Sequence, residues 1–318
     1  MSAAIETSHL TKDFLVGFWR PRPYRALDGL TLSVEPGEVF GFLGPNGAGK
    51  STTLKLLMQL IYPSAGEARI LGRPAGDVAV RQRIGFLAEN PYYYDYLTAE
   101  EVLTYFARLF GLRGQATTDR VARVLDEVGL GAERRMRLRQ FSKGMLQRVG
   151  LAQALINDPE VVFLDEPMSG LDPLGRRQVR DLILQLRAKG TTVFFSSHIL
   201  SDAETLCSRV GIMAQGRLAA TGRISEMVAF QLKGWELVAA GVTDEVRAAL
   251  APKVVEMRPL SPGRYTIQIA PEEKPERLMM ELSTRGASVE SLHPLRDTLE
   301  DYFLQQVKAA KARDTGGL

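Results

Sequence analysis

The chain has 318 residues, of which 45% are hydrophobic and 24% charged, and its formal net charge is +3. Such a composition is typical of a globular protein with enough apolar material for two domains. The charge is too small to indicate a nucleic-acid-binding surface. A single cysteine, Cys207, excludes an internal disulfide framework and fits a reducing compartment.

No apolar run approaches the roughly 18–20 residues of a membrane-spanning helix, and the first residues do not form a signal-peptide pattern. We therefore expect a cytoplasmic protein that meets a membrane only through a partner.

Up to residue 224, short apolar runs alternate with helical patterns, which predicts an α/β domain around a mostly parallel sheet. The predicted buried strands are 39–43, 84–87, 161–164, 193–196 and 210–214. A helical subdomain is expected at about 91–158. One of its helices spans 98–110 and opens on the capping-box pair Thr98 and Glu101, and another covers 119–128.

From residue 225 the pattern changes. Strands are predicted at 236–239, 254–257, 265–269 and 288–292, and helices at 244–250 and 275–283. This is the split βαβ order of a ferredoxin-like α+β domain, which we expect at 225–307. A last helix is predicted from Asp297, with Asp297 and Glu300 as a capping box, and 308–318 is expected to be a flexible tail.

The sequence GPNGAGKS at 44–51 fits the phosphate-loop pattern G-x-x-x-x-G-K-[ST], between a predicted strand and a helical run that starts at Thr52. Glycines let backbone N–H groups turn toward a polyanion, and the helix N-terminus adds partial positive charge. Lys50 is expected to reach the outer phosphates, and the Ser51 hydroxyl to hold magnesium. The loop predicts a nucleoside triphosphate site.

A second motif, VVFLDE at 161–166, places two carboxylates at the C-terminal end of a buried strand, where ligands bind in parallel α/β sheets. Asp165 is expected to support magnesium, and Glu166 to polarise an attacking water. The alternative is a pair of solvated acids that ends the strand.

Three weaker signals complete the pattern. Ser142, Lys143 and Gly144 open a helix and form an anion-binding surface, although a serine N-cap explains them equally well. Residues 169–172 resemble an ordinary turn. His198 ends a strand and suits either a functional or a merely structural role.

Taken together and in this order, the motifs resemble the ATP-binding subunit of an ABC transporter, over residues 5–222. The resemblance implies a P-loop ATPase with Glu166 as catalytic base, His198 as switch histidine and 169–172 as the D-loop. It implies ATP and Mg²⁺ as cofactors. The implied ATP-binding residues are Phe14, Gly44, Pro45, Asn46, Gly47, Ala48, Gly49, Lys50, Ser51, Thr52, Ser142, Lys143 and Gly144. Phe14 would stack on adenine, but it could be a core residue, with Phe18, Trp19 or Tyr24 stacking instead.

The sequence departs from the usual motifs of this family at two places. The segment FSKGM at 141–145 replaces the usual L-S-G-G-Q, which adds Lys143 near the anion. Glu89 stands where the family commonly has glutamine. The implied metal ligands are therefore Ser51, Glu89 and Asp165. Both variants, and the ending TLEDYF at 298–303, resemble the subfamily paired with ABC-2-type permeases, which are typically exporters.

The resemblance also implies a head-to-tail dimer, expected to be a homodimer, with each ATP between 44–52 of one subunit and 142–144 of the other. A transmembrane permease would insert a short helix into a groove near Glu89. Tyr92, Tyr93, Tyr94 and Tyr96 could line that groove or could pack in the core. The aromatic and basic segment 18–24 suits a partner or membrane contact, or a surface hairpin loop.

Two other functions are compatible with a phosphate loop. A soluble ABC ATPase that acts on DNA or ribosomes would be expected to have a long coiled coil or a second cassette, and neither is found in this sequence. A non-catalytic nucleotide sensor would be expected to have a damaged site, whereas Lys50, Asp165, Glu166 and His198 are all present. We therefore expect a transport ATPase at the cytoplasmic face of the membrane.

Overall fold

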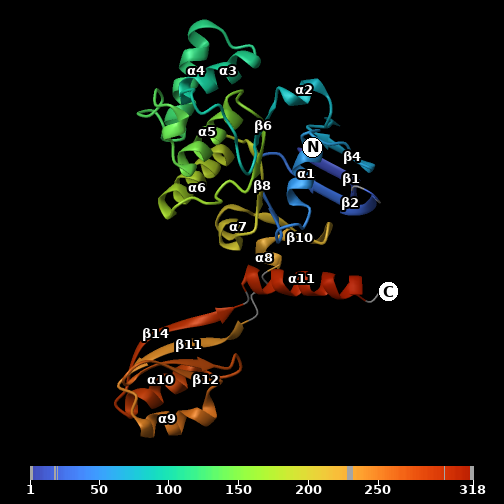
Figure 1. Cartoon of the computed structure of the whole chain (residues 1–318). Helices are drawn as coiled ribbons and strands as arrows, with labels where there is room; N and C mark the ends of the chain where they lie inside the picture. Colours follow the sequence, from blue (N-terminus) through green and yellow to red (C-terminus); the bar gives the residue numbers. More distant parts are fainter. Residues whose placement is uncertain (1–2, 18, 20, 228–231, 297, 316–318) are drawn as a thin grey trace. The chain divides into compact units, whose positions relative to one another are not determined.

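The computed structural model describes residues 3–17, 19, 21–227, 232–296 and 298–315. The chain forms two compact units, residues 1–224 with 303–318 and residues 225–302 (Figure 1). Among the described residues, no helix combines the length and apolar character needed to cross a bilayer.

The strands of the first unit are β1 (Ile5–Val16), β2 (Arg22–Val34), β3 (Val39–Leu43), β4 (Ala65–Ile70), β5 (Arg73–Pro74), β6 (Ile84–Leu87), β7 (Val161–Asp165), β8 (Thr192–Ser197), β9 (Arg209–Ala214) and β10 (Arg217–Arg223). Its helices are α1 (Lys50–Leu57), α2 (Val78–Arg81), α3 (Ala99–Leu109), α4 (Gly114–Glu127), the 3-10 helix η1 (Leu138–Gln140), α5 (Lys143–Leu155), α6 (Pro173–Ala188) and α7 (Leu200–Leu206).

A mostly parallel sheet runs through this unit in the order β10-β9-β3-β8-β7-β6, with β10 antiparallel to β9. Every residue of β3, β7 and β8 is buried, as expected for parallel strands covered on both faces. The five strands predicted from the sequence are confirmed, with ends within one residue. Because the strands are parallel, the residues that follow β3, β7 and β8 meet at one edge.

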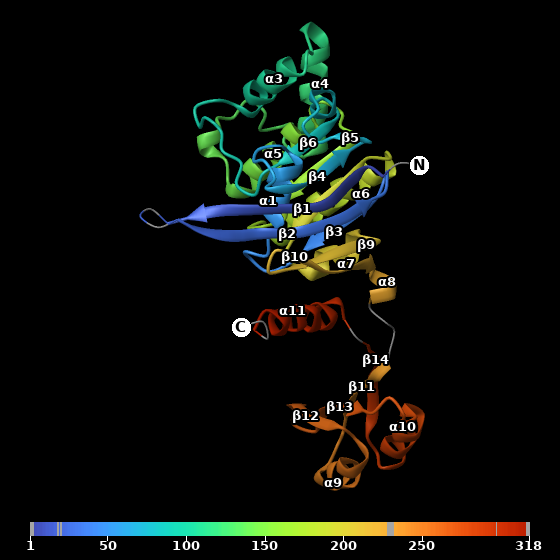
Figure 2. The ribbon, with the colours of Figure 1, turned by 90° about the vertical axis from the view of Figure 1, so that its right-hand side faces the viewer.

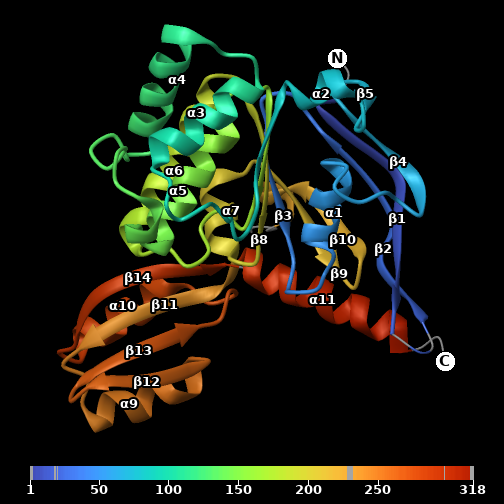
Figure 3. The ribbon, with the colours of Figure 1, turned by 45° about the horizontal axis from the view of Figure 1, so that its top comes forward.

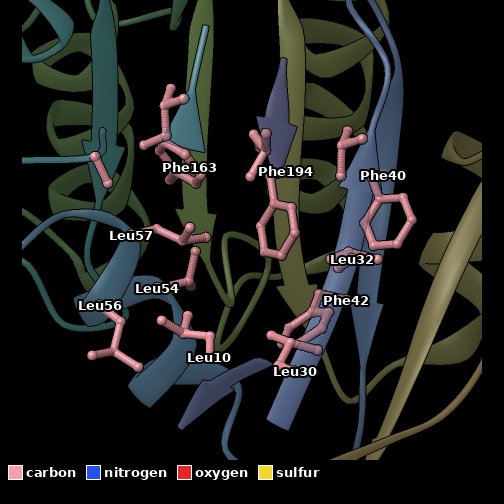
Figure 4. Packing of buried hydrophobic residues seen from close by; sticks show 14 of the residues in the cluster. Leu10, Leu30, Leu32, Phe40, Phe42, Leu54, Leu56, Leu57, Phe163 and Phe194 are labelled. Carbon is pink, nitrogen blue, oxygen red and sulfur yellow. The ribbon is translucent and has the colours of Figure 1, made fainter. Parts of the chain in front are cut away.

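The core that holds the sheet is aromatic. The Phe194 ring centroid lies 5.6 Å from that of Phe40, 5.1 Å from that of Phe42 and 5.9 Å from that of Phe163. Figure 4 shows these rings with Leu54 of α1 and the leucines of β1 and β2 in the same cluster. The cluster therefore fixes α1 between the parallel sheet and a second sheet.

That second sheet is antiparallel, in the order β2-β1-β4-β5, and was not predicted. Its two long strands, β1 and β2, run side by side to their turn (Figure 2). Residues 22–24 of the segment 18–24 thus belong to β2 of this hairpin, while Phe18 and Arg20 lie outside the described residues.

Helices α3, α4 and α5 pack on one another and form the helical part of the unit (Figure 3). The predicted capping box of α3 is confirmed, because the Thr98 side chain accepts from Glu101 N and the Glu101 side chain accepts from Thr98 N. The predicted helix 119–128 starts earlier, at Gly114 of α4.

After α8 (Ile224–Met227), the second unit contains β11 (Leu232–Ala240), α9 (Asp244–Leu250), η2 (Ala251–Lys253), β12 (Glu256–Ser261), β13 (Arg264–Ile269), α10 (Pro275–Thr284) and β14 (Ser288–Arg296), followed by α11 (Leu299–Thr315). Its sheet order, β12-β13-β11-β14, is that of a ferredoxin-like domain, as predicted. Leu237 and Ile267 of the sheet pack with Leu250 of α9 and Leu282 of α10.

The start and end of the last helix differ from the prediction. Asp297 lies outside the described residues. The capping box consists of Thr298 and Asp301 instead: Thr298 N donates to the Asp301 carboxylate, and Asp301 N donates to the Thr298 hydroxyl. Much of the predicted flexible tail is helical, since α11 continues to Thr315 through a stretch rich in alanine and lysine, which are good helix formers.

A glycine in β6 sets how closely α5 approaches the sheet. A Cβ atom built on Gly85 would lie 1.8 Å from the carbonyl oxygen of Ala154, which is rigid helix backbone. We expect Gly85→Ala to lower the free energy of unfolding by about 1–3 kcal/mol because α5 must move away. Denaturant unfolding of the full chain measures this. At Gly76, the nearest atoms are those of the flexible Gln59 side chain, so an equal loss in the control Gly76→Ala would contradict the explanation.

Candidate functional site

The glycine loop at 44–49 joins β3 to α1, and its shape requires glycine at particular positions. Gly47 and Gly49 have φ values of 78° and 101°, a left-handed conformation that other residues rarely adopt. A Cβ on Gly49 would lie 2.8 Å from the Ala26 carbonyl oxygen. The loop leads directly into α1 at Lys50, where the first N–H groups of a helix are free to bind an anion.

Lys50 is buried, with 6% of its surface exposed. Its Nζ donates to the carbonyl oxygen of Gly44 at 2.6 Å and to that of Pro45 at 3.3 Å. Lys50 Nζ also pairs with Glu166 Oε1 at 3.2 Å. The ammonium group is therefore held inside the loop by two carbonyls and a carboxylate.

Asp165 ends β7 and receives two hydroxyl groups. Ser51 Oγ donates to Asp165 Oδ1 at 3.2 Å, and Ser196 Oγ of β8 donates to the same oxygen at 2.6 Å. Ser196 Oγ also accepts from Glu166 N at 2.9 Å. A serine inside a buried strand carries no motif, so the sequence alone does not point to Ser196.

Glu166 has a strained backbone, with a φ of 49° in a residue that is not glycine. Its side chain is 8% exposed and is held at both oxygens: Oε1 faces Lys50, and Oε2 lies 2.8 Å from His198 Nδ1. The imidazole of His198 is 45% exposed. A buried carboxylate placed between a cation and an imidazole can accept or release a proton.

Beside this cluster lies a cavity of about 330 Å³, here called the loop cavity, which is bordered by Phe14, Tyr24, Ala26, residues 45–52, Glu89 and Glu166. Phe14 is half-buried at its edge, so it is not a core residue. Trp19 is 90% exposed and does not border the cavity. Phe18 lies outside the described residues.

The donors near Asp165 fit a magnesium ion. Ser51, which borders the loop cavity, offers a hydroxyl, and its partner Asp165 offers a carboxylate. Glu89 also borders the cavity, and such oxygen ligands are those that Mg²⁺ prefers. No group of three or more His, Cys, Asp or Glu side chains forms a complete metal site within the described part of the chain. An ion held here would need phosphate or water oxygens as further ligands.

Residues 142–144 lie apart from the loop cavity, and none of them borders it. Ser142 is the N-cap of α5, because its Oγ accepts from Met145 N at 3.2 Å. Ser142 and Lys143 are exposed, and Gly144 is half-buried. Within one chain, the structure therefore does not bring the predicted signature residues to the loop.

The tyrosine run after Glu89 divides into two kinds of residue. Tyr92, Tyr94 and Tyr96 are 91%, 66% and 58% exposed. Tyr93 is half-buried, its hydroxyl lies 2.6 Å from Gln153 Oε1, and burial raises its pKa. Tyr93 belongs to the packing of α5, whereas the other three form a surface.

Comparison with known proteins agrees with this geometry. The ABC transporter family matches residues 27–169. The chain is 44% identical to the uncharacterised ABC transporter ATP-binding protein sll0415 of Synechocystis, over 96% of this chain and 84% of the relative. It is 40% identical to the bacitracin transport ATP-binding protein BcrA of Bacillus licheniformis, over 69% of each. The post-hydrolysis dimer of the ATP-binding cassette MJ0796 bound to ADP and Pi has a TM-score of 0.64 and 25% identity, covering 69% of this chain and 98% of that one.

The glycine loop between a buried parallel strand and a helix defines a P-loop nucleoside triphosphatase. The chain belongs to the ABC transporter family, as an ATP-binding subunit and an ATPase.

The Ser196 hydroxyl joins the ends of β7 and β8. We expect Ser196→Ala to cost about 1–3 kcal/mol of unfolding free energy, because it leaves Asp165 Oδ1 and Glu166 N short of a buried partner. Thermal or denaturant unfolding measures the loss. Ser208 is exposed, so Ser208→Ala is the control. Equal stability of the two variants would contradict this role of Ser196.

Proposed function

We propose that this chain powers an exporter by hydrolysing ATP at the loop cavity and acting on a separate ABC-2-type membrane permease. The observation that carries the proposal is the buried pair of Lys50 and Glu166 beside the glycine loop, with His198 on the second oxygen of Glu166. The FSKGM and TLEDYF segments favour the exporter subfamily. A relative named for bacitracin transport supports a transport role.

The triphosphate would lie on loop 44–52, with its outer phosphates at Lys50. To reach them, the ammonium would exchange the Gly44 and Pro45 carbonyls and Glu166 Oε1 for phosphate oxygens. That exchange would release one carboxylate oxygen of Glu166. The general base would thus become free when substrate is bound.

Glu166 would then take a proton from the attacking water, while His198 holds the other carboxylate oxygen in place. Ser51 and Asp165, with Glu89 at the edge, would hold Mg²⁺. When bound, the ion neutralises charge on the outer phosphates. Phe14, which borders the loop cavity, would stack on adenine.

Ser142, Lys143 and Gly144 would complete the site of a second subunit. They do not border the loop cavity of their own chain, so a phosphate contact requires another copy. A solved dimer of a similar cassette supports this arrangement. We propose a homodimer in which each γ-phosphate bridges two helix N-termini and holds the subunits together until hydrolysis.

The permease would dock beside Glu89. Tyr92, Tyr94 and Tyr96 form an exposed aromatic surface there, and such residues are enriched at protein interfaces. This placement would put the chain on the cytoplasmic face of the membrane. The domain 225–307 is proposed to stabilise the assembly.

The test of the proposed base is Glu166→Gln, which keeps the shape of the side chain and removes its basicity. We expect ATP binding to persist and turnover to fall by about 10²–10⁴-fold. Steady-state phosphate release, with and without the permease, measures turnover, and equilibrium dialysis measures binding. Hydrolysis at the wild-type rate would show that Glu166 is not the base.

A further inference from the structure

A cross-strand aromatic pair borders the loop cavity. Phe14 of β1 and Tyr24 of β2 are directly opposite each other in the antiparallel register. Directly opposed residues lie on the same face of a sheet, with Cβ atoms about 5 Å apart. Both side chains border the loop cavity.

The other face of the hairpin fixes this register. Asp13 and Arg25 are the next opposed pair, and Arg25 Nε donates to Asp13 Oδ1 at 2.8 Å. Arg25 also pairs with Asp28 at 3.2 Å. Because side chains alternate along a strand, this ion pair points away from the cavity and leaves Phe14 and Tyr24 on the cavity side.

The position of Tyr24 relative to the phosphate loop follows from Ala26. The Ala26 carbonyl lies against Gly49, at 2.8 Å from where a Cβ atom would be. Tyr24 is two residues earlier on β2, and it borders the loop cavity as Ala26 does. Its ring is therefore close to the loop that would hold the phosphates.

The two rings differ in how they are held. Lys12 Nζ lies 5.1 Å from the ring centroid of Phe14 and donates to the Tyr62 carbonyl at 2.7 Å, so one side of Phe14 is already covered. Tyr24 is 52% exposed, and its side chain makes no hydrogen bond or aromatic contact within the described residues. The Tyr24 ring is open to a ligand.

We propose that Tyr24 is a second base-binding residue, which together with Phe14 forms a platform under the purine of ATP. The two rings border one cavity from opposed strand positions without touching each other, so they can support the two fused rings of a purine side by side. A pyrimidine has one ring and would cover only part of the platform. The pair thus selects purine over pyrimidine nucleotides. This inference rests on the proposed ATP site.

The test is equilibrium binding of Mg²⁺ complexes of ATP, CTP and tripolyphosphate to the full chain. We expect Tyr24→Ser to weaken ATP binding about tenfold, as loss of one stacked aromatic does elsewhere. CTP affinity should fall less, so the preference for ATP over CTP shrinks. Tripolyphosphate has no base, so Tyr24→Ser and the wild type should bind it with the same affinity.

Two further variants sharpen the result. Tyr24→Phe keeps the ring and should restore the ATP affinity lost in Tyr24→Ser. Leu15 is 77% exposed on the same hairpin and does not border the cavity, so Leu15→Ser is the matched control.

The inference fails if Tyr24→Ser binds ATP as the wild type does, or if it loses ATP and tripolyphosphate equally. A wild-type chain that binds neither ATP nor tripolyphosphate would instead overturn the proposed function.

Discussion

The candidate site depends on one constraint, which is the pairing of two buried charges at the end of β7. Lys50 and Glu166 are 6% and 7% exposed, and removing either charge from water costs several kcal/mol unless it is paired. The two charged groups pair with each other. Lys50 also donates to two loop carbonyls, and Glu166 also contacts His198. The pairing requires β3, β7 and β8 to end at one edge, which the parallel sheet provides. In the proposed mechanism, this pairing would keep the carboxylate engaged until a triphosphate binds to Lys50.

The second constraint is the contact between the antiparallel sheet and the glycine loop. Gly216 N donates to Ala48 O, and Asp28 N donates to Gly216 O, so the turn after β9 connects the loop to β2. The Ala26 carbonyl leaves room only for glycine at position 49. The strand that carries Tyr24 is thereby fixed to the loop that carries Lys50, and both residues border the loop cavity.

Sequence alone predicted what local patterns encode. Buried parallel strands are continuous apolar runs, and the Thr98 cap of α3 is a short-range signal, so both were found. Strands β1 and β2 were missed because they are long, half-exposed and interrupted by polar residues, and only pairing across the hairpin defines them. Ser196 was missed because its role depends on Asp165 of a neighbouring strand. The placement of Phe14 and Tyr24 on one face likewise follows from register, which composition does not reveal.

The central claim is that the 44–52 loop grips a triphosphate through Lys50, and binding of ATP with Mg²⁺ to the purified chain tests it most directly. Titration calorimetry should detect one ATP per wild-type chain, and an affinity at least tenfold lower in Lys50→Ala, because a buried charged contact to phosphate is lost. Failure of the wild type to take up ATP, or equal affinity in Lys50→Ala, would contradict the account.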